Sequence, residues 1–193
     1  MESRGQDVDN YPFFHILQLK NMEFFEVINS RTSIRDFDPT NPVKQDILMK
    51  ILEAGRVAPS AANRQPWKFI IVSSETMLDK VRKCYHRPWF KDAPHILIVI
   101  GNKNDAWVRK DDGYNALETD LTIAMDHMIL AAHSLGISTC WIAAFENSVL
   151  RTALNMKEDE IVYAITPLGY PHKEFKQVYE KVRKPLEDVI EFI

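Results

Sequence analysis

The segment that decides the fold is residues 115–135, NALETDLTIAMDHMILAAHSL. Its apolar side chains recur at spacings of three and four, which predicts a helix with a wide stripe that faces a core. The stripe consists of Leu117, Leu121, Ala124, Met125, Met128, Ile129, Ala132 and Leu135. Gly136 follows directly, and a glycine just beyond the C-cap is typical of a helix end. We therefore expect the strongest helix of the chain over about Asn115–Leu135.

Working outward, the sequence predicts strands and further helices on both sides of this helix. Strands are expected where aromatic, β-branched or continuously apolar residues lie between breakers: Trp67–Val72, His95–Ile100, Ser138–Ala143 and Glu160–Leu168. Helices are expected over Glu23–Ser30, from Asn41 as N-cap and Pro42 at the first helical position to about Arg56, over Glu75–Tyr85, and from Asn147 as N-cap to about Leu154. This order predicts an α+β fold, with a mixed β-sheet flanked by helices on both faces.

Composition limits the class of protein. The chain has 193 residues, of which 46% are hydrophobic and 26% charged, so it suits one globular domain. We expect that domain over residues 22–193, with residues 1–21 as a loose extension or a misjudged start. The net charge of −3 argues against a nucleic-acid partner, and the central apolar run, Ile96–Ile100, is far shorter than the roughly 20 residues that span a membrane. Two cysteines cannot build a disulfide framework, which favours the cytoplasm.

Spacing excludes several common chemistries. The six glycines form no GxG pair, so the chain has neither a dinucleotide-binding fingerprint nor a phosphate-binding P-loop. His127 and His133 would point about 240° apart on the long helix, so they cannot share a metal ion and we expect no metal site. Cys140 is expected to be a small core residue rather than a catalytic thiol.

Two polar segments carry more functional groups than an ordinary connection needs. Arg31-Thr32-Ser33-Ile34-Arg35 combines two guanidinium groups with two hydroxyls, which suits a phosphate or an electron-rich ring edge. Pro59–Trp67 combines small residues with Asn63 and Gln65, whose amides can recognise an imide edge or a ribityl chain. A solvated surface loop and a plain helix–strand connection remain the alternatives for these two segments.

The C-terminal region adds two weaker signals. Lys181 and Arg183 form a basic pair, and an apolar end follows it, made of Leu186, Val189, Ile190, Phe192 and Ile193. An apolar segment without an amphipathic partner nearby usually covers another surface. A second subunit is the expected surface, and the alternative is that the tail folds back on its own sheet.

Together these features resemble the FMN-dependent nitroreductase family. In the family's order, the matching stretches are residues 31–37 (RTSIRDF), 58–67 (APSAANRQPW), 135–142 (LGISTCWI), 168–171 (LGYP) and the basic pair before Lys184-Pro185-Leu186. The first two stretches are fairly specific and the others are supportive. The resemblance covers about residues 23–193.

The resemblance implies a domain-swapped homodimer that holds one FMN per site at the subunit interface. No catalytic side chain is implied beyond the ligands of the flavin. By position in the family's motifs, the phosphate, ribityl and pyrimidine ligands from one subunit would be Arg31, Thr32, Ser33 and Arg35, with Lys181 and Arg183 as a second phosphate clamp. The second subunit would contribute Pro59, Ser60, Ala61, Asn63 and Gln65, while Ile142, Ala143 and Ala144 would lie along the isoalloxazine. Family members often carry a glycine near Ala143 or Ala144, which this chain lacks.

The resemblance also implies an activity, namely ping-pong reduction of nitroaromatics, quinones or similar electron-poor compounds with NAD(P)H. Arg35 is the candidate for stabilising the negative charge of the reduced flavin. One rival is a flavin-dependent relative with other chemistry, such as dehalogenation, azoline dehydrogenation or flavin breakdown; the other is a non-enzymatic flavin-binding module. A candidate lid, Tyr85–Lys91 and Asn102–Gly113, suits a flat aromatic substrate because it contains Trp89, Phe90 and Trp107.

Overall fold

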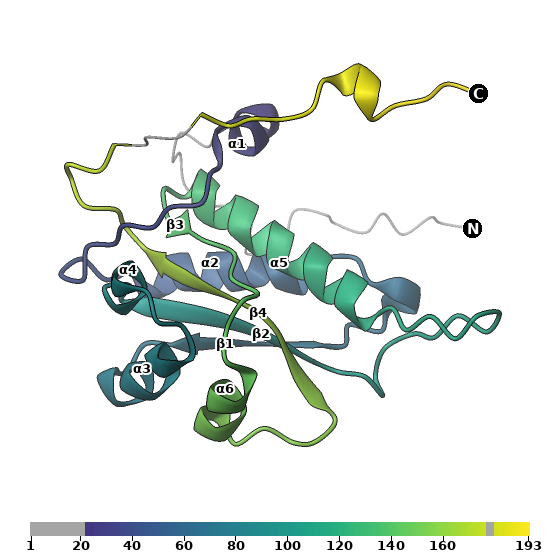
Figure 1. The fold of residues 1–193 in the computed structure, drawn as a ribbon, viewed down its shortest axis with the longest axis horizontal. Coiled ribbons are helices and arrows are strands. Elements are labelled where there is room, and N and C mark those ends of the chain that lie inside the picture. Colours follow the sequence, from purple (N-terminus) through teal and green to yellow (C-terminus); the bar gives the residue numbers. More distant parts are fainter. Residues whose placement is uncertain (1–21, 177–179) are drawn as a thin grey trace, which may run out of the picture.

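The protein is an α+β sandwich in which a four-stranded sheet lies between two layers of helices (Figure 1). The computed structural model describes residues 22–176 and 180–193. The strands are β1 (Trp67–Val72), β2 (His95–Asn102), β3 (Ser138–Thr139) and β4 (Glu160–Gly169), in the order β1-β2-β4-β3. The α-helices are α1 (Phe24–Ser30), α2 (Gln45–Arg56), α3 (Glu75–Val81), α4 (Pro88–Lys91), α5 (Leu117–Ser134) and α6 (Asn147–Leu154). Short 3₁₀ turns are η2 (Ala61–Asn63), η3 (Arg82–Cys84) and η4 (Leu186–Asp188).

Strand β2 divides the interior into two cores, because successive side chains of a strand point to opposite faces. Leu97 and Val99 pack in the core that α2 and α5 cover. Ile96, Ile98 and Ile100 pack in the other core, which contains residues of α3, α4 and α6. Helices on both faces of the sheet were predicted from the sequence, and the structure confirms them.

The sheet differs in one respect from the expected mixed sheet: each pairing among the described strands is antiparallel. Strand β1 pairs with β2 along its whole length, and the α3–α4 excursion between them leaves and re-enters the sheet at the same end. An antiparallel neighbour needs no crossover, so α3 and α4 pack on one face while the chain reverses direction between β1 and β2.

Several element boundaries differ because tertiary hydrogen bonds override local signals. Helix α2 begins at Gln45 rather than after an Asn41 cap, since the Val43 N–H donates to His95 Nε2 at 3.1 Å and Lys44 is the N-cap. Strand β3 stops at Thr139 instead of Ala143, because the Cys140 N–H donates to the Thr166 hydroxyl.

Smaller corrections apply to three other boundaries. Asn147 is the first residue of α6 and Glu146 is its N-cap. The helix expected over Glu75–Tyr85 changes to 3₁₀ geometry after Val81. Strand β2 continues through Gly101, where an added Cβ would clash with Pro66 O and with Leu117. The end of the long helix is as predicted, with Gly136 at φ +75°.

The candidate lid separates into two unlike parts. In residues 85–91, Pro88–Lys91 forms α4, and Phe90 is fully buried in the core that also contains Ile96, so this part is packed against the body. Residues 103–116 do form a projecting hairpin, seen at the right of Figure 1, with Arg109 N–H donating to Tyr114 O and Ala116 N–H to Trp107 O. Of the two parts, this hairpin is the one available to cover a site.

The C-terminal arm, residues 180–193, does not fold back on the sheet of its own chain. It runs past α1 and away from the body (yellow in Figure 1). Its apolar side chains are exposed, with Phe192 at 94% and Leu186 at 68%. The arm therefore offers an apolar surface that this chain does not cover. Residues 1–21 lie outside the described residues, and within the described ranges no helix is long and apolar enough to cross a membrane.

We expect acid to destabilise the fold through His95. The ring accepts the Val43 N–H on Nε2, so it is neutral, and its Nδ1–H donates to Ser73 Oγ at 2.7 Å. Burial lowers the pKa of His95 below its ordinary 6.5. His95 therefore binds a proton more readily in the unfolded chain than in the folded one. Its contribution to the free energy of unfolding is fully present above pH 6.5 and is lost as the pH falls toward the folded-state pKa. The loss is about 1.4 kcal/mol for each unit by which folding lowers the pKa.

Urea unfolding between pH 7.5 and pH 5, at one protein concentration, measures this effect. His95→Gln should flatten the loss of stability on acidification. His172→Asn is a control with the opposite expected effect. Asp36 raises the pKa of His172, so removing that ring should make the loss of stability on acidification larger. A wild-type pH profile that His95→Gln leaves unchanged would contradict the assignment.

Candidate functional site

The basic segment after α1, residues 31–37, is held in an extended conformation across the edge of the sheet. The Ile34 N–H donates to Thr139 O at 2.9 Å, and Phe37 is buried against Pro94 and Gly169. With Ile34 and Phe37 anchored, Ser33 and Arg35 on either side of Ile34 are exposed. The structure therefore presents both polar side chains at the surface, next to the start of β3.

Three of the predicted cofactor ligands, Arg31, Ser33 and Arg35, influence the thiol of Cys140. Burial raises the pKa of this thiol, while hydrogen bonding from Ser33 and Arg35 and the positive charges of Arg35 and Arg31 lower it. Arg31, Ser33 and Arg35 are thus brought together, with Thr32 half-buried between them. Cys140 is buried, as predicted. Its position beneath the basic segment was not predicted, because no feature of the sequence indicated it.

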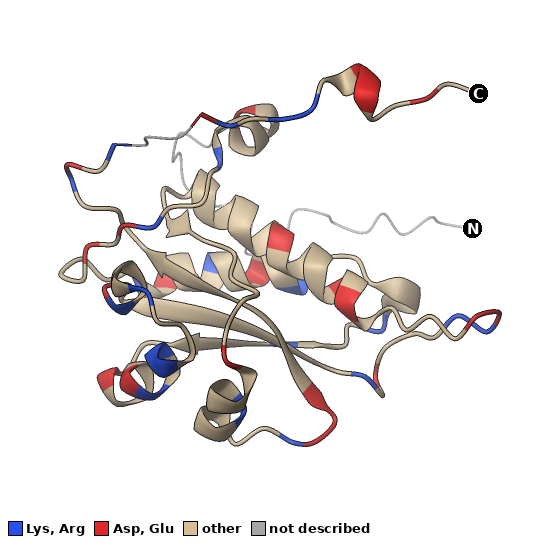
Figure 2. Cartoon of the chain, in the orientation of Figure 1, with Lys and Arg blue, Asp and Glu red and all other residues tan. Residues whose placement is uncertain are grey.

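The second basic pair lies beside the first. Lys181 Nζ donates to Ile28 O at 2.6 Å and to Asn29 O at 3.0 Å, which ties the C-terminal arm to the end of α1. Desolvation, and then the charges of Arg31 and Arg183, lower the pKa of Lys181. In Figure 2 the Lys and Arg residues of the arm lie alongside those that follow α1.

His133, in the last turn of α5, lies beside these groups. Its Nε2 lies 2.8 Å from Ser30 Oγ, and burial followed by the charges of Arg31 and Lys181 lowers its pKa. No ion pair among the described residues includes Arg31, Lys181 or Arg183. We call Arg31, Lys181 and Arg183 the cationic cluster, and His133, whose pKa is lowered, is its neighbour. A concentration of positive charge that is not in ion-pair contact with carboxylates suits an anion.

The loop from Pro59 to Gln65, here called the amide loop, is strained and internally hydrogen-bonded. Ala62, Asn63 and Gln65 have φ values of 50°, 53° and 50°, a conformation that non-glycine residues rarely adopt. The Gln65 N–H donates to Ser60 Oγ at 2.9 Å, and Gln65 Nε2 donates to Asn63 Oδ1 at 3.1 Å. Such strain is concentrated at functional sites.

This arrangement determines which groups of the amide loop are left for a ligand. Because Gln65 Nε2 donates to Asn63, the adjacent groups that remain are the Gln65 Oε1 acceptor and the Asn63 Nδ2 donor. Both side chains are exposed. An acceptor next to a donor complements the imide edge of a flat heterocycle.

The amide loop and the cationic cluster lie at opposite ends of α5. The Ala61 N–H donates to Asp120 in the first turn of α5, whereas Ser30 contacts His133 in the last turn. Thirteen residues of helix, at 1.5 Å each, separate these contacts by about 20 Å. One chain therefore does not bring the two predicted halves of the site together.

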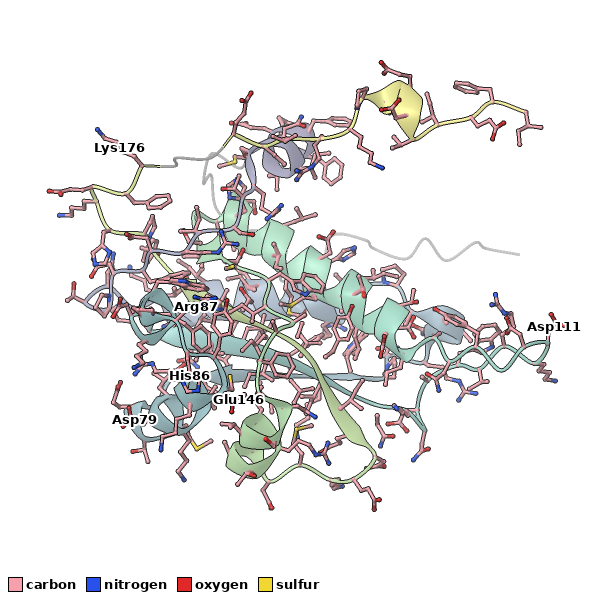
Figure 3. The ribbon with its side chains drawn as sticks, in the orientation of Figure 1. Asp79, His86, Arg87, Asp111, Glu146 and Lys176 are labelled. Carbon is pink, nitrogen blue, oxygen red and sulfur yellow. The ribbon has the colours of Figure 1, made fainter. Side chains whose placement is uncertain are left out.

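The segment after β3 contributes unequally to the site. Ile142 is buried and exchanges both backbone hydrogen bonds with Ile165, whereas Ala143 and Ala144 are exposed. The far end of this segment is fixed to the second core by the Glu146 N–H to Cys84 O bond, and by the pair of His86 and Glu146 seen in Figure 3. Of the three predicted residues, only Ala143 and Ala144 present surface to a ligand.

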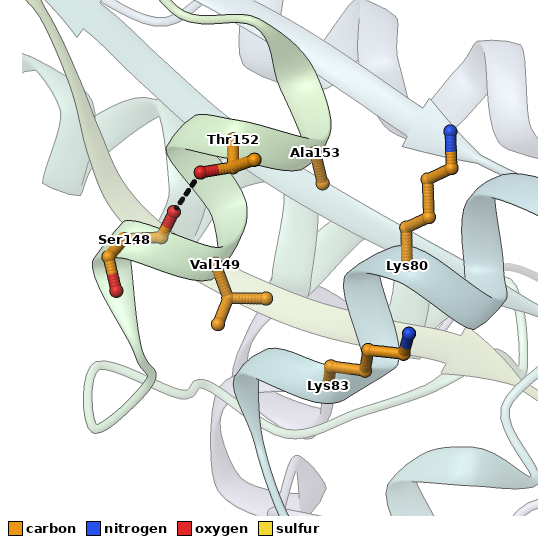
Figure 4. A pocket seen from close by; sticks show the side chains of 6 residues that line it. All are labelled: Lys80, Lys83, Ser148, Val149, Thr152 and Ala153. Carbon is orange, nitrogen blue, oxygen red and sulfur yellow. Dashed lines mark hydrogen bonds between the residues drawn. The ribbon is translucent and has the colours of Figure 1, made fainter.

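Two cavities accompany these groups. One of about 730 Å³ lies beside Arg35 and is bordered by Asp36, Asp38 and residues 172–176. The other, of about 480 Å³, lies between α3 and α6, remote from the cationic cluster; Figure 4 shows Lys80 and Lys83 on one side of it and Val149 on the other. Within the described ranges, no group of three or more His, Cys, Asp or Glu side chains could hold a metal ion.

Comparison with known proteins adds a family and several relatives. The family model described as "Nitroreductase family" matches residues 28–84 and 76–170. A protein of Methanothermobacter thermautotrophicus named "Putative NADH dehydrogenase/NAD(P)H nitroreductase" is 33% identical over 159 residues, which are 80% of each chain. Iodotyrosine deiodinase 1 of Sus scrofa is 25% identical over 222 residues, covering 96% of this chain and 75% of the relative.

Solved structures agree in fold. A nitroreductase family protein from Clostridium difficile 630 superposes with a TM-score of 0.81 at 29% identity, covering 89% of this chain and 98% of that one. A structure described as "a putative nitroreductase in complex with fmn", from Desulfovibrio desulfuricans, has a TM-score of 0.74 at 24% identity and covers 88% of this chain and 95% of the other.

Proposed function

The chain belongs to the nitroreductase family, and we propose that it is a homodimeric FMN-dependent oxidoreductase that uses NAD(P)H to reduce small electron-poor substrates. The observation that carries this proposal is the cationic cluster, which has the charge to hold a phosphate monoester and no carboxylate in ion-pair contact among the described residues. A relative of the same fold binds FMN.

The residues present fit FMN in type and placement. Arg31, Lys181 and Arg183 would hold the terminal phosphate, with His133 beside them. Ser33 and Arg35 would meet the ribityl chain and the pyrimidine edge. The dinucleotide FAD fits less well, because the chain has no glycine cradle for a pyrophosphate.

A second subunit would complete the site. The amide loop lies about 20 Å along α5 from the cationic cluster, so the two halves meet only if the loop comes from another copy. The exposed apolar arm supplies a surface for such a copy to bury. A site shared by two subunits then contains Arg35 of one and Asn63 of the other.

The chemistry divides between cofactor and protein. When bound, FMN supplies the capacity to accept a hydride from NAD(P)H and to pass electrons to a substrate. Arg35 would stabilise the negative charge that reduction places on the pyrimidine ring, through a permanently protonated guanidinium. Exposed Ala143 and Ala144 leave room for a flat ligand, and the 103–116 hairpin is the candidate cover, because the Asn102 N–H that precedes it donates to Pro66 O beside the amide loop.

A second candidate is reductive dehalogenation of an aromatic substrate. Iodotyrosine deiodinase 1 aligns with 96% of this chain, more than the 80% of the relative named as a nitroreductase. The hairpin presents Trp107 and the stacked pair of Arg109 and Tyr114, with the guanidinium carbon 4.9 Å from the ring centre. Those groups suit an aromatic substrate in either reaction.

Two measurements test the function. Denaturation of the purified protein should release FMN, identified by chromatography, and recovery of FAD alone would refute the cofactor assignment. Steady-state oxidation of NADH and NADPH with a nitroaromatic, a quinone and a halotyrosine then separates the two reactions. A protein that binds FMN and oxidises neither nicotinamide with any of these acceptors would be a flavin-binding module instead.

We expect Arg183→Ala to weaken FMN binding by about ten- to hundredfold while leaving the fold intact. A charge-assisted hydrogen bond to phosphate is worth roughly 1.5–3 kcal/mol, and Arg183 lies in the exposed arm, outside both cores. The measurement is flavin titration of the FMN-free protein. Lys184→Ala is the matched control, since Lys184 is the adjacent cation and is not among the charges that lower the Lys181 pKa. Equal affinities in the two variants would place the arm away from the phosphate.

A further inference from the structure

A buried carboxylate lies directly beneath the amide loop. Asp120 is in the first turn of α5 and is 1% exposed. It stands in the apolar stripe of that helix, three residues after Leu117 and four before Ala124, where an apolar side chain would be expected. Burying a carboxylate is costly unless it is hydrogen-bonded or paired, so the contacts of Asp120 have to account for it.

Those contacts lead to the amide loop. Asp120 Oδ1 accepts the Ala61 N–H at 2.9 Å, across 59 residues of sequence. Its other oxygen, Oδ2, is fully buried and has no hydrogen-bond partner in the described part of the chain. The N-terminal turn of α5 stabilises a negative charge at this position. Asp120 therefore has more acceptor capacity than the single Ala61 N–H uses.

The position of this bond is informative, because the strained residues follow it at once. Ala62, Asn63 and Gln65 all have positive φ, and none is a glycine. Backbone strain persists only where the surrounding structure fixes it. The loop's own bonds, Gln65 N–H to Ser60 Oγ and Gln65 Nε2 to Asn63, close the turn locally but do not attach it to the body. The bond from Ala61 to Asp120 does attach it.

We propose that Asp120 is a positioning residue that anchors the amide loop in its strained form, so that Asn63 and Gln65 are already placed for the flavin. Asp120 touches the loop backbone and not the ligand. The inference rests on the proposed function, since that function makes the flavin the ligand of the loop. Anchoring lowers the ordering cost of binding, which is the general effect of preorganisation.

Hydrogen exchange in the full-length FMN-free protein tests the anchor without any ligand. Asp120→Ala should accelerate amide exchange in residues 59–66 by about tenfold or more and leave β2 and β4 protected, because a lost hydrogen bond to a charged group is worth roughly 1.5–3 kcal/mol. Asp120→Asn keeps an oxygen acceptor in the same place and should stay within about threefold of wild type. Glu118→Ala is the matched control: it removes an exposed acid from the same helical turn and should change nothing in the loop.

FMN titration of the same four proteins completes the test. Asp120→Ala should bind FMN about tenfold or more weakly than wild type, with Asp120→Asn and Glu118→Ala close to wild type. Unchanged exchange in residues 59–66 of Asp120→Ala, or acceleration spread equally over the whole chain, would overturn the anchoring role. If exchange accelerates in the loop but the wild-type protein binds no FMN, the proposed function fails and the anchor stands.

Discussion

Substituting Leu186→Asp and Phe192→Asp together is expected to convert the protein into a monomer that binds little flavin. These side chains are 68% and 94% exposed in the isolated chain, on an arm that contacts neither core. Burying a large apolar side chain is worth about 1.5–3 kcal/mol, so the pair contributes roughly 3–6 kcal/mol to association. Losing it weakens the dimer by a factor on the order of 10² to 10⁴.

Light scattering and flavin absorbance measure the two consequences. The wild-type protein should have twice the mass of the 22.4 kDa chain, and the double variant the mass of one chain, with roughly a hundredfold less bound FMN or lower. Glu191→Gln is the control, because it changes a polar residue of the same arm and should leave mass and flavin content unaltered. A wild-type monomer with a full complement of FMN would defeat the dimer proposal, whereas a double variant that stays dimeric would show that the arm does not hold the dimer together.

The long helix and the central strand could be predicted because their signals are local and repeated. Seven apolar positions of the predicted stripe recur along α5, and β2 contains the continuous apolar run Ile96–Ile100. The class of fold and the helices on both faces followed from the order of such elements. Predictions that depended on a single residue were less secure: Asn41 looks like an N-cap, yet the Val43 N–H is taken by His95 from a distant strand.

The residues of the candidate site could be proposed from composition, but their arrangement could not. Arg31, Ser33, Arg35 and the amide loop stand out by residue type. The sequence alone does not show that roughly 20 Å of α5 separates the amide loop from the cationic cluster. His133 and Cys140 offered no signal, since each is ordinary in its sequence context and gains its role from neighbours far along the chain. Asp120 did offer a signal in the sequence, because it is an acidic residue within the apolar stripe of the long helix.

Co-production of two inactive variants is expected to restore activity if the site is shared between subunits. Arg35→Ala removes the guanidinium proposed to stabilise the reduced flavin, and Asn63→Leu removes an amide of the loop proposed to come from the other chain. Each variant alone should be nearly inactive, because both sites of its homodimer carry the same lesion.

The mixed dimer differs from both homodimers because its lesions are distributed unequally. One of its sites combines the Arg35→Ala change of the first chain with the Asn63→Leu change of the second, whereas the other site has Arg35 and Asn63 intact. Random mixing makes half of the dimers mixed, with one working site in two, so activity should return to about a quarter of the wild-type value. Differently tagged chains, purified in succession, isolate the mixed dimer and should raise this to about one half.

The control for this experiment is a mixed dimer, isolated in the same way, with both lesions in one chain and none in the other. If the site is shared, each site of that dimer carries one lesion and should be inactive, although the number of lesions per dimer is the same. The two arrangements therefore differ only in which chain carries which change. Should the dimer with both lesions in one chain be active while the dimer with one lesion in each chain is not, Arg35 and Asn63 belong to the same subunit and the shared site is wrong.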